Sequence, residues 1–259
     1  MKNTSIFALT VLMLVCSPVL PPAHALVFFG EDINTSYTGG AVDDSVPLVV
    51  RPNSDAASNS FQSQLTGVST ENFEGFANGA TPTVLTFGPD LASLTGNPSI
   101  LEVAAGTTFN GIYPTSGTKT LFQVLQSSFD ISFSSPQAAF GFYATDIGEL
   151  ASLQLSFDSV SGPDVLIPVP HTLNPNNTGS VLFFGYIDAQ NPFNKVTFIN
   201  TNPGSNDGFG YDDLTIGRAE NVVDTTVPEP GTLALFVLGG IGTALTRRNK
   251  WGQPTLERE

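Results

Sequence analysis

The chain of 259 residues has 23 acidic side chains against 9 lysines and arginines, a formal net charge of −14. This charge excludes nucleic acid as a partner and disfavours anionic membrane surfaces, because both repel an acidic protein. The excess has two interpretations, a soluble secreted surface or an affinity for calcium, which takes oxygen ligands. Many glycines and phenylalanines with only two methionines are typical of a β-rich exported domain.

Residues 1–25 read as a Sec signal peptide. Lys2 supplies the positive end, residues 6–15 are apolar, and Ala23-His24-Ala25 is a small-x-small cleavage site, so we expect a cut after Ala25. Cys16 raises the alternative of a lipoprotein, but Val15 stands where that signal needs a small residue. Because Cys16 is the only cysteine, the exported domain has no disulfide.

The next two segments lead into the main domain. Residues 26–52 carry short apolar runs between turn residues and predict a weak strand or a loosely attached N-terminal arm. Residues 53–67 have helical spacing, with Asn53 or Ser54 as the cap and Gly67 at the end. Ala57, Phe61 and Leu65 lie four residues apart, so this short helix is expected to pack one face on a sheet.

From residue 68 the apolar residues recur with period two, which indicates strands. Phe129, Ile131 and Phe133 alternate with polar residues, as do Leu153, Leu155 and Phe157, and all six are expected to point into the core. Glycine, proline and asparagine clusters separate the segments, and no helices intervene. The pattern predicts an all-β fold, a jelly-roll-like β-sandwich over residues 53–217. The expected strands are 70–76, 84–87, 121–125, 129–133, 138–143, 153–157, 165–169, 181–186, 195–200 and 214–216.

The C-terminal region begins with a linker, residues 218–226, and then Pro228-Glu229-Pro230. Residues 231–246 carry no charge and would span about 24 Å as a helix at about 1.5 Å per residue, which predicts a short transmembrane helix. Arg247 and Arg248 follow, as is typical of a cytoplasmic end.

This order of motifs over residues 227–251 resembles the PEP-CTERM sorting tail of Gram-negative bacteria. The resemblance implies cleavage by a membrane exosortase near Pro228, Glu229 and Pro230, then delivery from the inner membrane to the cell surface or the extracellular polysaccharide. The alternative is an ordinary C-terminal membrane anchor. Residues 252–259 form a polar extension beyond the usual end of such tails.

Three further motifs, 72–76, 140–143 and 208–214, look like the β-sandwich domain often found before this tail, and more loosely like jelly-roll carbohydrate-binding modules. In such modules the first and last strands are neighbours, and their carboxylates can hold a structural calcium. The resemblance implies Glu74 and Asp212 as ligands, with Asp213 and Asp207 in reserve. Asp212 shares parity with Leu214 and Ile216, so it is expected on the interior side of the sheet. The alternative is that Asp212 and Asp213 cap a turn.

Catalytic patterns are missing from the sequence. It has no phosphate-binding glycine loop and no His or Cys cluster with metal spacing, and His171 is the only histidine outside the signal peptide. We therefore expect an exported, non-enzymatic protein of the cell surface or extracellular matrix, with the exosortase and extracellular polysaccharide as partners. The alternatives are a carbohydrate-binding module and a secreted hydrolase.

Overall fold

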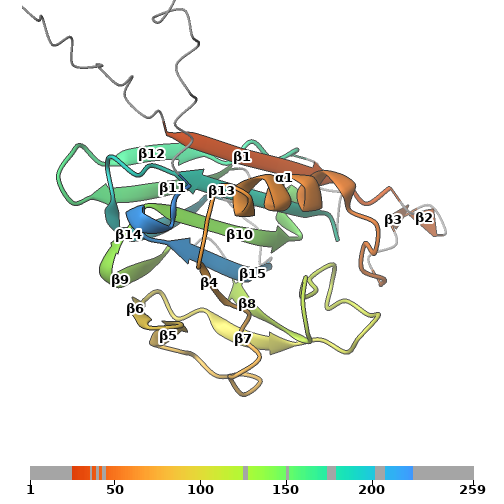
Figure 1. Cartoon of the computed structure of the whole chain (residues 1–259). Helices are drawn as coiled ribbons and strands as arrows, with labels where there is room; N and C mark the ends of the chain where they lie inside the picture. Colours follow the sequence, from red (N-terminus) through yellow and green to blue (C-terminus); the bar gives the residue numbers. More distant parts are fainter. Residues whose placement is uncertain are drawn as a thin grey trace, which may run out of the picture. The chain divides into compact units, whose positions relative to one another are not determined.

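Two antiparallel β-sheets packed face to face make up most of the described part of the chain (Figure 1). A computed structural model describes residues 25–35, 37–38, 41–42, 45–124, 128–149, 152–173, 179–201 and 208–223. The expected signal peptide up to residue 24, the residues from 224 onward and Asp207 therefore lie outside the described residues. Among the described residues, no helix has the length and apolar character needed to cross a bilayer.

The larger sheet has seven strands, and its central strand β15 (Gly208–Gly217) is the longest. Each strand is antiparallel to its neighbours, and β4 (Ser69–Glu71) and β8 (Lys119–Val124) pair with successive parts of β15. The first strand of the expected sandwich thus lies beside the last. The remaining strands are β1 (Leu26–Asp32), β13 (Val181–Ile187), β10 (Ala139–Thr145) and β7 (Ser99–Glu102), in the order β1-β13-β10-β15-β8-β7.

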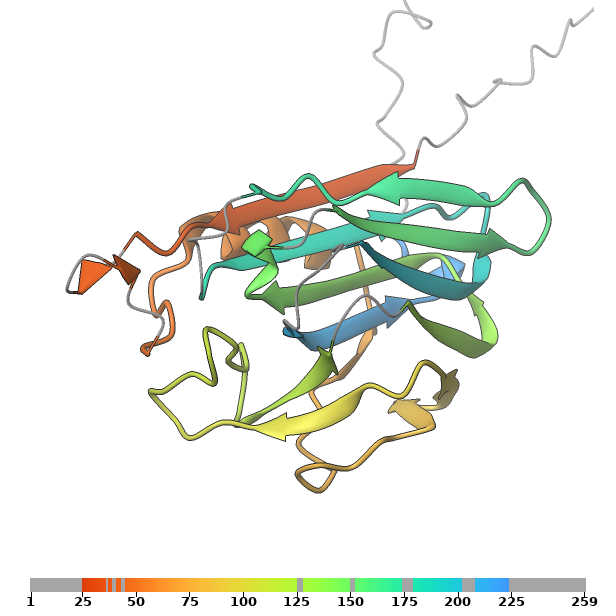
Figure 2. The ribbon, with the colours of Figure 1, turned by 180° about the vertical axis from the view of Figure 1, so that it is seen from behind.

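The smaller sheet has six strands, and the view from behind brings it to the front (Figure 2). Its order is β12 (Val165–Pro168), β11 (Ser152–Ser159), β14 (Phe193–Thr201), β9 (Phe129–Gln137), β6 (Asp90–Leu94) and β5 (Val84–Phe87). A separate hairpin joins β2 (Tyr37–Thr38) to β3 (Ala41–Val42), and two 3-10 turns are η1 (Ile147–Glu149) and η2 (Ala219–Asn221). The predicted all-β, two-sheet sandwich with one helix is confirmed.

An aromatic-rich core fills the space between the sheets. All six side chains expected to point inward on β9 and β11 are buried in it, which confirms the predicted alternation. Phe129 stacks on Phe198 with ring centroids 4.3 Å apart, and Tyr211 meets both rings edge-on. Aromatic pairs of this kind add about 0.5–1.5 kcal/mol beyond the apolar area they bury.

The helix α1 (Pro52–Gln62) lies on the outer face of the larger sheet, against β1 and β13 (Figure 1). Its anchor is the fully buried Phe61, which rests on Gly141 and Gly185. A Cβ at Gly185 would lie 2.6 Å from the Phe61 ring, and one at Gly141 would lie 2.8 Å from it. The register pairs these two glycines across β10 and β13. Together they form a slot that lets the helix approach the sheet.

Several element boundaries differ from those expected. The helix ends at Gln62 instead of continuing to residue 67, and the strand expected over 70–76 stops at Glu71. Phe73 has φ of +62°, which breaks the extended backbone and turns its ring into the core. Residues 26–32 of the expected arm form the edge strand β1, fully paired with β13. The sequence does not predict strand β6. In that strand the polar Asp90 is buried while the apolar Leu91 is exposed, which is the reverse of the usual alternation.

Candidate functional site

A β-bulge in β15 sets the position of the two predicted aspartates. The pairing with β10 shifts register between Gly141 and Tyr143, and Asp213 takes φ of +49°. Because the bulge adds one residue, Tyr211 and Leu214 both point into the core between the sheets. Asp212 therefore lies on the outer face beside Tyr143, and not on the interior side that simple parity predicted.

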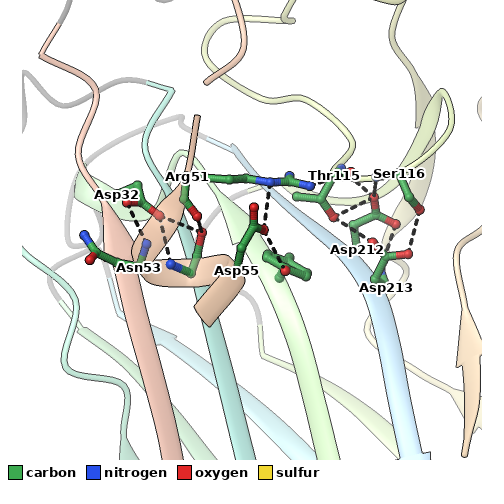
Figure 3. Close-up of polar contacts among 10 residues, drawn as sticks. Asp32, Arg51, Asn53, Asp55, Thr115, Ser116, Asp212 and Asp213 are labelled. Atoms are coloured by element: carbon green, nitrogen blue, oxygen red, sulfur yellow. Dashed lines mark hydrogen bonds and ion pairs between the residues drawn. The ribbon is translucent and has the colours of Figure 1, made fainter. Parts of the chain in front are cut away.

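Asp212 is nevertheless buried, with 1% of its surface exposed, because a loop covers it. It lies where β15 passes from pairing with β8 to pairing with β4, and the loop enters at that point. One carboxylate oxygen accepts hydrogen bonds from the backbone N–H groups of Thr115 at 2.7 Å and Ser116 at 3.1 Å. Asp213 accepts from the hydroxyl groups of the same two residues, at 3.0 Å and 2.6 Å (Figure 3).

The electrostatic state of Asp212 follows from this burial. Desolvation and the neighbouring Asp213 raise the pKa of Asp212 well above its ordinary value. The backbone N–H groups of Ser116, Asp213 and Thr115 oppose that rise, because they stabilise the ionised form. The carboxyl thus holds the loop in place although burial disfavours its ionised form.

Glu74 holds the next part of the same loop. Its carboxylate accepts hydrogen bonds from the backbone N–H groups of Thr118 and Lys119, both at 2.7 Å. Burial raises the pKa of Glu74, but these hydrogen bonds outweigh it and leave the pKa below its ordinary value. Glu74 does not lie in a strand, as the sequence predicted, but in the turn that follows β4.

Arg51 joins this cluster to the helix. Its guanidinium donates to the carbonyl oxygen of Thr115 at 3.0 Å, pairs with Asp55 at 3.1 Å and lies over the Tyr143 ring at 5.1 Å. The Tyr143 hydroxyl donates to Asp55, so side chains from α1 and β10 are connected to the loop (Figure 3). Burial raises the pKa of Tyr143 to about 12, so its hydroxyl stays protonated.

At the other end of this network, Asp32 caps α1 from a different element. The residue at the helix start, Arg51, makes no side-chain cap. Instead Asp32, at the end of β1, accepts from the backbone N–H groups of Asn53 at 3.1 Å and Ser54 at 2.8 Å. A carboxylate there satisfies free N–H groups and complements the positive end of the helix dipole. Local sequence does not reveal this role, because Asp32 precedes the helix by about twenty residues.

The predicted calcium ligands are therefore only partly assembled. Asp212 and Asp213 meet on the loop, and Glu74 holds a neighbouring stretch, while Asp207 lies outside the described residues. In the part of the chain that the structure describes, no group of three or more histidine, cysteine or acidic side chains has the arrangement of a metal site. The carboxylates instead accept backbone N–H bonds, as the capping alternative requires, and the calcium site stays a prediction.

The C-terminal motif has a match among known protein families. The sequence model described as the PEP-CTERM protein-sorting motif matches residues 226–248. The chain carries a PEP-CTERM sorting motif. The match includes Pro228, Glu229, Pro230, Arg247 and Arg248, all of which lie outside the described residues. A PEP-CTERM motif implies a secreted protein that its C-terminal segment anchors in the membrane before processing.

Beyond the PEP-CTERM match, the comparisons with known proteins give no relative with close similarity to the chain. No curated protein sequence matches the chain. Among solved structures, the K2 cleaved adhesin domain of Lys-gingipain is 13% identical, with a TM-score of 0.38, and the match covers 58% of this chain and 97% of that domain. A point mutant of a family 29 carbohydrate-binding module is 19% identical, with a TM-score of 0.29 and coverage of 61% and 96%. The C-terminal family 22 module of Clostridium thermocellum Xyn10B is 14% identical, with a TM-score of 0.31 and coverage of 60% and 94%.

Proposed function

We propose that this protein is an exported, non-enzymatic β-sandwich that an exosortase processes at its C-terminus. After processing it is associated with the cell surface or the extracellular polysaccharide of a Gram-negative bacterium. The observation that carries the proposal is the PEP-CTERM motif at residues 226–248. In this function the sandwich is the exported part, and residues 227–251 carry the sorting signal.

The chemistry of the tail supports this proposal. The two prolines around Glu229 lack backbone N–H donors, so their sequence disfavours continuation of a strand at this point. The uncharged residues 231–246 favour the bilayer, and the arginines that follow favour its cytoplasmic side. The Pro-Glu-Pro segment therefore belongs on the outer side of the inner membrane, where an exported protein is processed.

The test is expression in a host that has an exosortase. The mature protein is expected to lose residues 231–246, and replacement of Pro228, Glu229 and Pro230 by alanine is expected to leave the precursor in the inner membrane. A matched control replaces Val223, Asp224 and Thr225 by alanine and should be processed normally. Mass spectrometry of surface protein that still contains residues 231–246 would contradict the proposal.

A second candidate function, saccharide binding by the sandwich, has one specific observation in its favour. A small cavity opens where the chain crosses between the two sheets, and Asp90, Gln137 and Arg218 are among the polar residues that line it.

A further inference from the structure

The segment that follows β15, residues 218–222, is attached to the sandwich, and we call it the docked segment. It contains the 3-10 turn η2 and ends at Val222, which forms an antiparallel bridge with Leu65. Beside this bridge, the backbone N–H of Thr66 donates to the carbonyl oxygen of Asn221 at 2.7 Å. Leu65 and Thr66 belong to the connection between α1 and β4. The docked segment is therefore joined to a part of the chain about 150 residues earlier.

The side chain of Asn221 completes this attachment. Its amide nitrogen Nδ2 donates to the carbonyl oxygen of Thr66 at 2.7 Å, and its Oδ1 accepts from the backbone N–H of Arg218 at 2.8 Å. Asn221 and Thr66 thus exchange hydrogen bonds in both directions. The amide uses a donor and an acceptor at once, which few other side chains can do.

The docked segment also contacts both sheets. At its start, the guanidinium of Arg218 donates from Nε to Asp90 of β6 at 3.1 Å, and a second nitrogen of the same group pairs with the other carboxylate oxygen. At its end, Val222 is partly buried against the apolar cluster that contains Leu65 and Phe61. The compact unit that holds the sandwich ends at Val222. The fold therefore extends closer to the sorting motif than the end of β15.

This attachment limits how far the sorting motif can lie from the folded sandwich. Five residues, 223–227, separate the docked segment from Pro228. Whatever their conformation, five residues span at most about 18 Å, at about 3.6 Å each. Release of residues 219–222 would raise the limit to nine residues, or about 32 Å. A folded sandwich cannot enter a cleft that binds its substrate as an extended peptide, so this length decides whether a protease can reach the motif.

We propose that the docked segment sets the reach of the sorting motif and that Asn221 is a positioning residue for its processing. The inference rests on the proposed function, because it concerns the same cut. In the natural chain, residues 223–227 are long enough for the exosortase to bind the motif while the segment stays docked. With a shorter spacer, the enzyme can act only on those molecules in which the segment is released. The cut therefore takes place close to a sandwich that is already folded.

The test shortens the spacer in a host that has an exosortase. Deletion of residues 223–225 leaves two spacer residues, which span at most about 7 Å. We expect this chain to keep residues 231–246. Replacement of the same three residues by alanine keeps the length and is the matched control, which should be processed normally. Mass spectrometry of the mature protein distinguishes the two results.

The decisive variant releases the docked segment in the shortened chain. Asn221→Ala together with Val222→Ser removes the side-chain contacts described above and is expected to restore processing. The physical reason is length, because release of residues 219–222 gives a spacer of six residues and a limit of about 22 Å. In the chain of natural length, the same two substitutions should leave processing unchanged. A merely structural role for Asn221 would lower the amount of processed protein and could not raise it.

Amide hydrogen exchange of the purified full-length protein checks that the segment is released without unfolding. Asn221→Ala is expected to speed exchange of the Thr66 N–H about tenfold, the effect of about 1.4 kcal/mol. The amides of Phe183 and Phe184 in β13 should keep their protection. Processing of the shortened chain is expected to rise in step with the exchange rate at Thr66.

Two results would overturn the inference. One is normal processing of the chain that lacks residues 223–225. The other is a shortened chain that stays unprocessed although both substitutions speed exchange at Thr66. A chain of natural length that keeps residues 231–246 would instead contradict the sorting proposal, and this inference with it, so the two failures are distinguishable.

Discussion

Single residues decide how the loop over Thr115 and Ser116 is held. One bulge residue directs Asp212 and Asp213 toward the same loop. Their carboxylates accept hydrogen bonds from Thr115 and Ser116 and so connect β15 to that loop. Burying a carboxyl beside another one is costly unless donors surround it. Here the backbone N–H groups of Thr115, Ser116 and Asp213 donate to Asp212, and the Thr115 hydroxyl lies within hydrogen-bond distance of both carboxylates. The site therefore combines a strong structural clamp with an acid whose charged form is disfavoured.

The first prediction at this scale concerns the pH dependence of stability. A carboxyl whose pKa is higher in the folded than in the unfolded protein binds more protons when folded, so stability falls as pH rises between the two values. For Asp212 that window begins near its ordinary value of 3.8 and extends upward. Asp212→Asn is expected to flatten this fall in the free energy of unfolding, measured by urea denaturation across a series of pH values.

The same substitution at Asp90 serves as a control of opposite sign. Its pKa is lowered in the folded protein, so its contribution to stability is present above 3.8 and is lost as pH falls through the folded value. Asp90→Asn is therefore expected to reduce the loss of stability on the acid side. If Asp212→Asn and Asp90→Asn changed the pH profile in the same direction, the account of Asp212 would be wrong.

At the scale of elements, the contact between α1 and the larger sheet depends on small residues in the strands. Gly141 and Gly185 lie inside two strands that each carry two phenylalanines, β10 and β13, and each lacks the Cβ that would collide with Phe61. Glycine in a strand interior weakens the strand by itself, and it commonly marks a close approach of another element. The motif Phe140-Gly141-Phe142-Tyr143, noticed in the sequence, thus has a packing explanation.

We expect Gly185→Ala to lower the free energy of unfolding by about 1–3 kcal/mol, the usual cost of overpacking a core. The reason is the 2.6 Å approach of a new Cβ to the Phe61 ring. Phe61→Leu, which removes the ring, is expected to recover part of that loss in the double variant. Gly75→Ala is the matched control, because a Cβ there meets nothing within 4 Å. Equal losses for Gly185→Ala and Gly75→Ala in chemical denaturation would contradict the slot.

At the scale of the whole molecule, the start of the chain matters more than its sequence indicates. Strand β1 begins at Leu26, directly after the expected signal-peptide cut, and pairs over its whole length with β13. It also supplies Asp32 to the helix and Phe28, whose ring meets that of Phe61 edge-on at 5.7 Å. Leu26, Ile187, Ala139 and Gly217 are in register across four adjacent strands. In chain order, the larger sheet starts with Leu26 of β1 and finishes with Gly217 of β15. These two residues therefore lie at the same end of the sandwich.

This arrangement predicts where a stable domain must begin. A chain of residues 26–226 is expected to unfold cooperatively, whereas one of residues 53–226 loses β1 and the cap of α1 and is expected to lose that cooperativity or to aggregate. Thermal unfolding followed by circular dichroism compares the two, and amide exchange reports whether β13 is still protected. Equal melting temperatures for the two chains would show that residues 26–52 are the loose arm that the sequence allowed.

The sequence by itself determined the properties that depend on neighbouring residues. The sorting motif is a contiguous string, so its order of prolines, apolar residues and arginines is complete without a fold. The inward side chains of β9 and β11 follow from strict period-two alternation, which burial on one face imposes locally.

Only the tertiary structure decided the sites. One extra residue at the bulge reverses the facing of Asp212, and parity along the strand cannot reveal where a bulge falls. Thr115 and Asp212 meet although they are 97 residues apart, and Asp90 meets Arg218 across 128 residues. Such contacts arise when two sheets pack and bring remote loops to one edge, so their geometry belongs to the folded sandwich as a whole. Local periodicity therefore identifies the strands, while packing places the polar side chains between them.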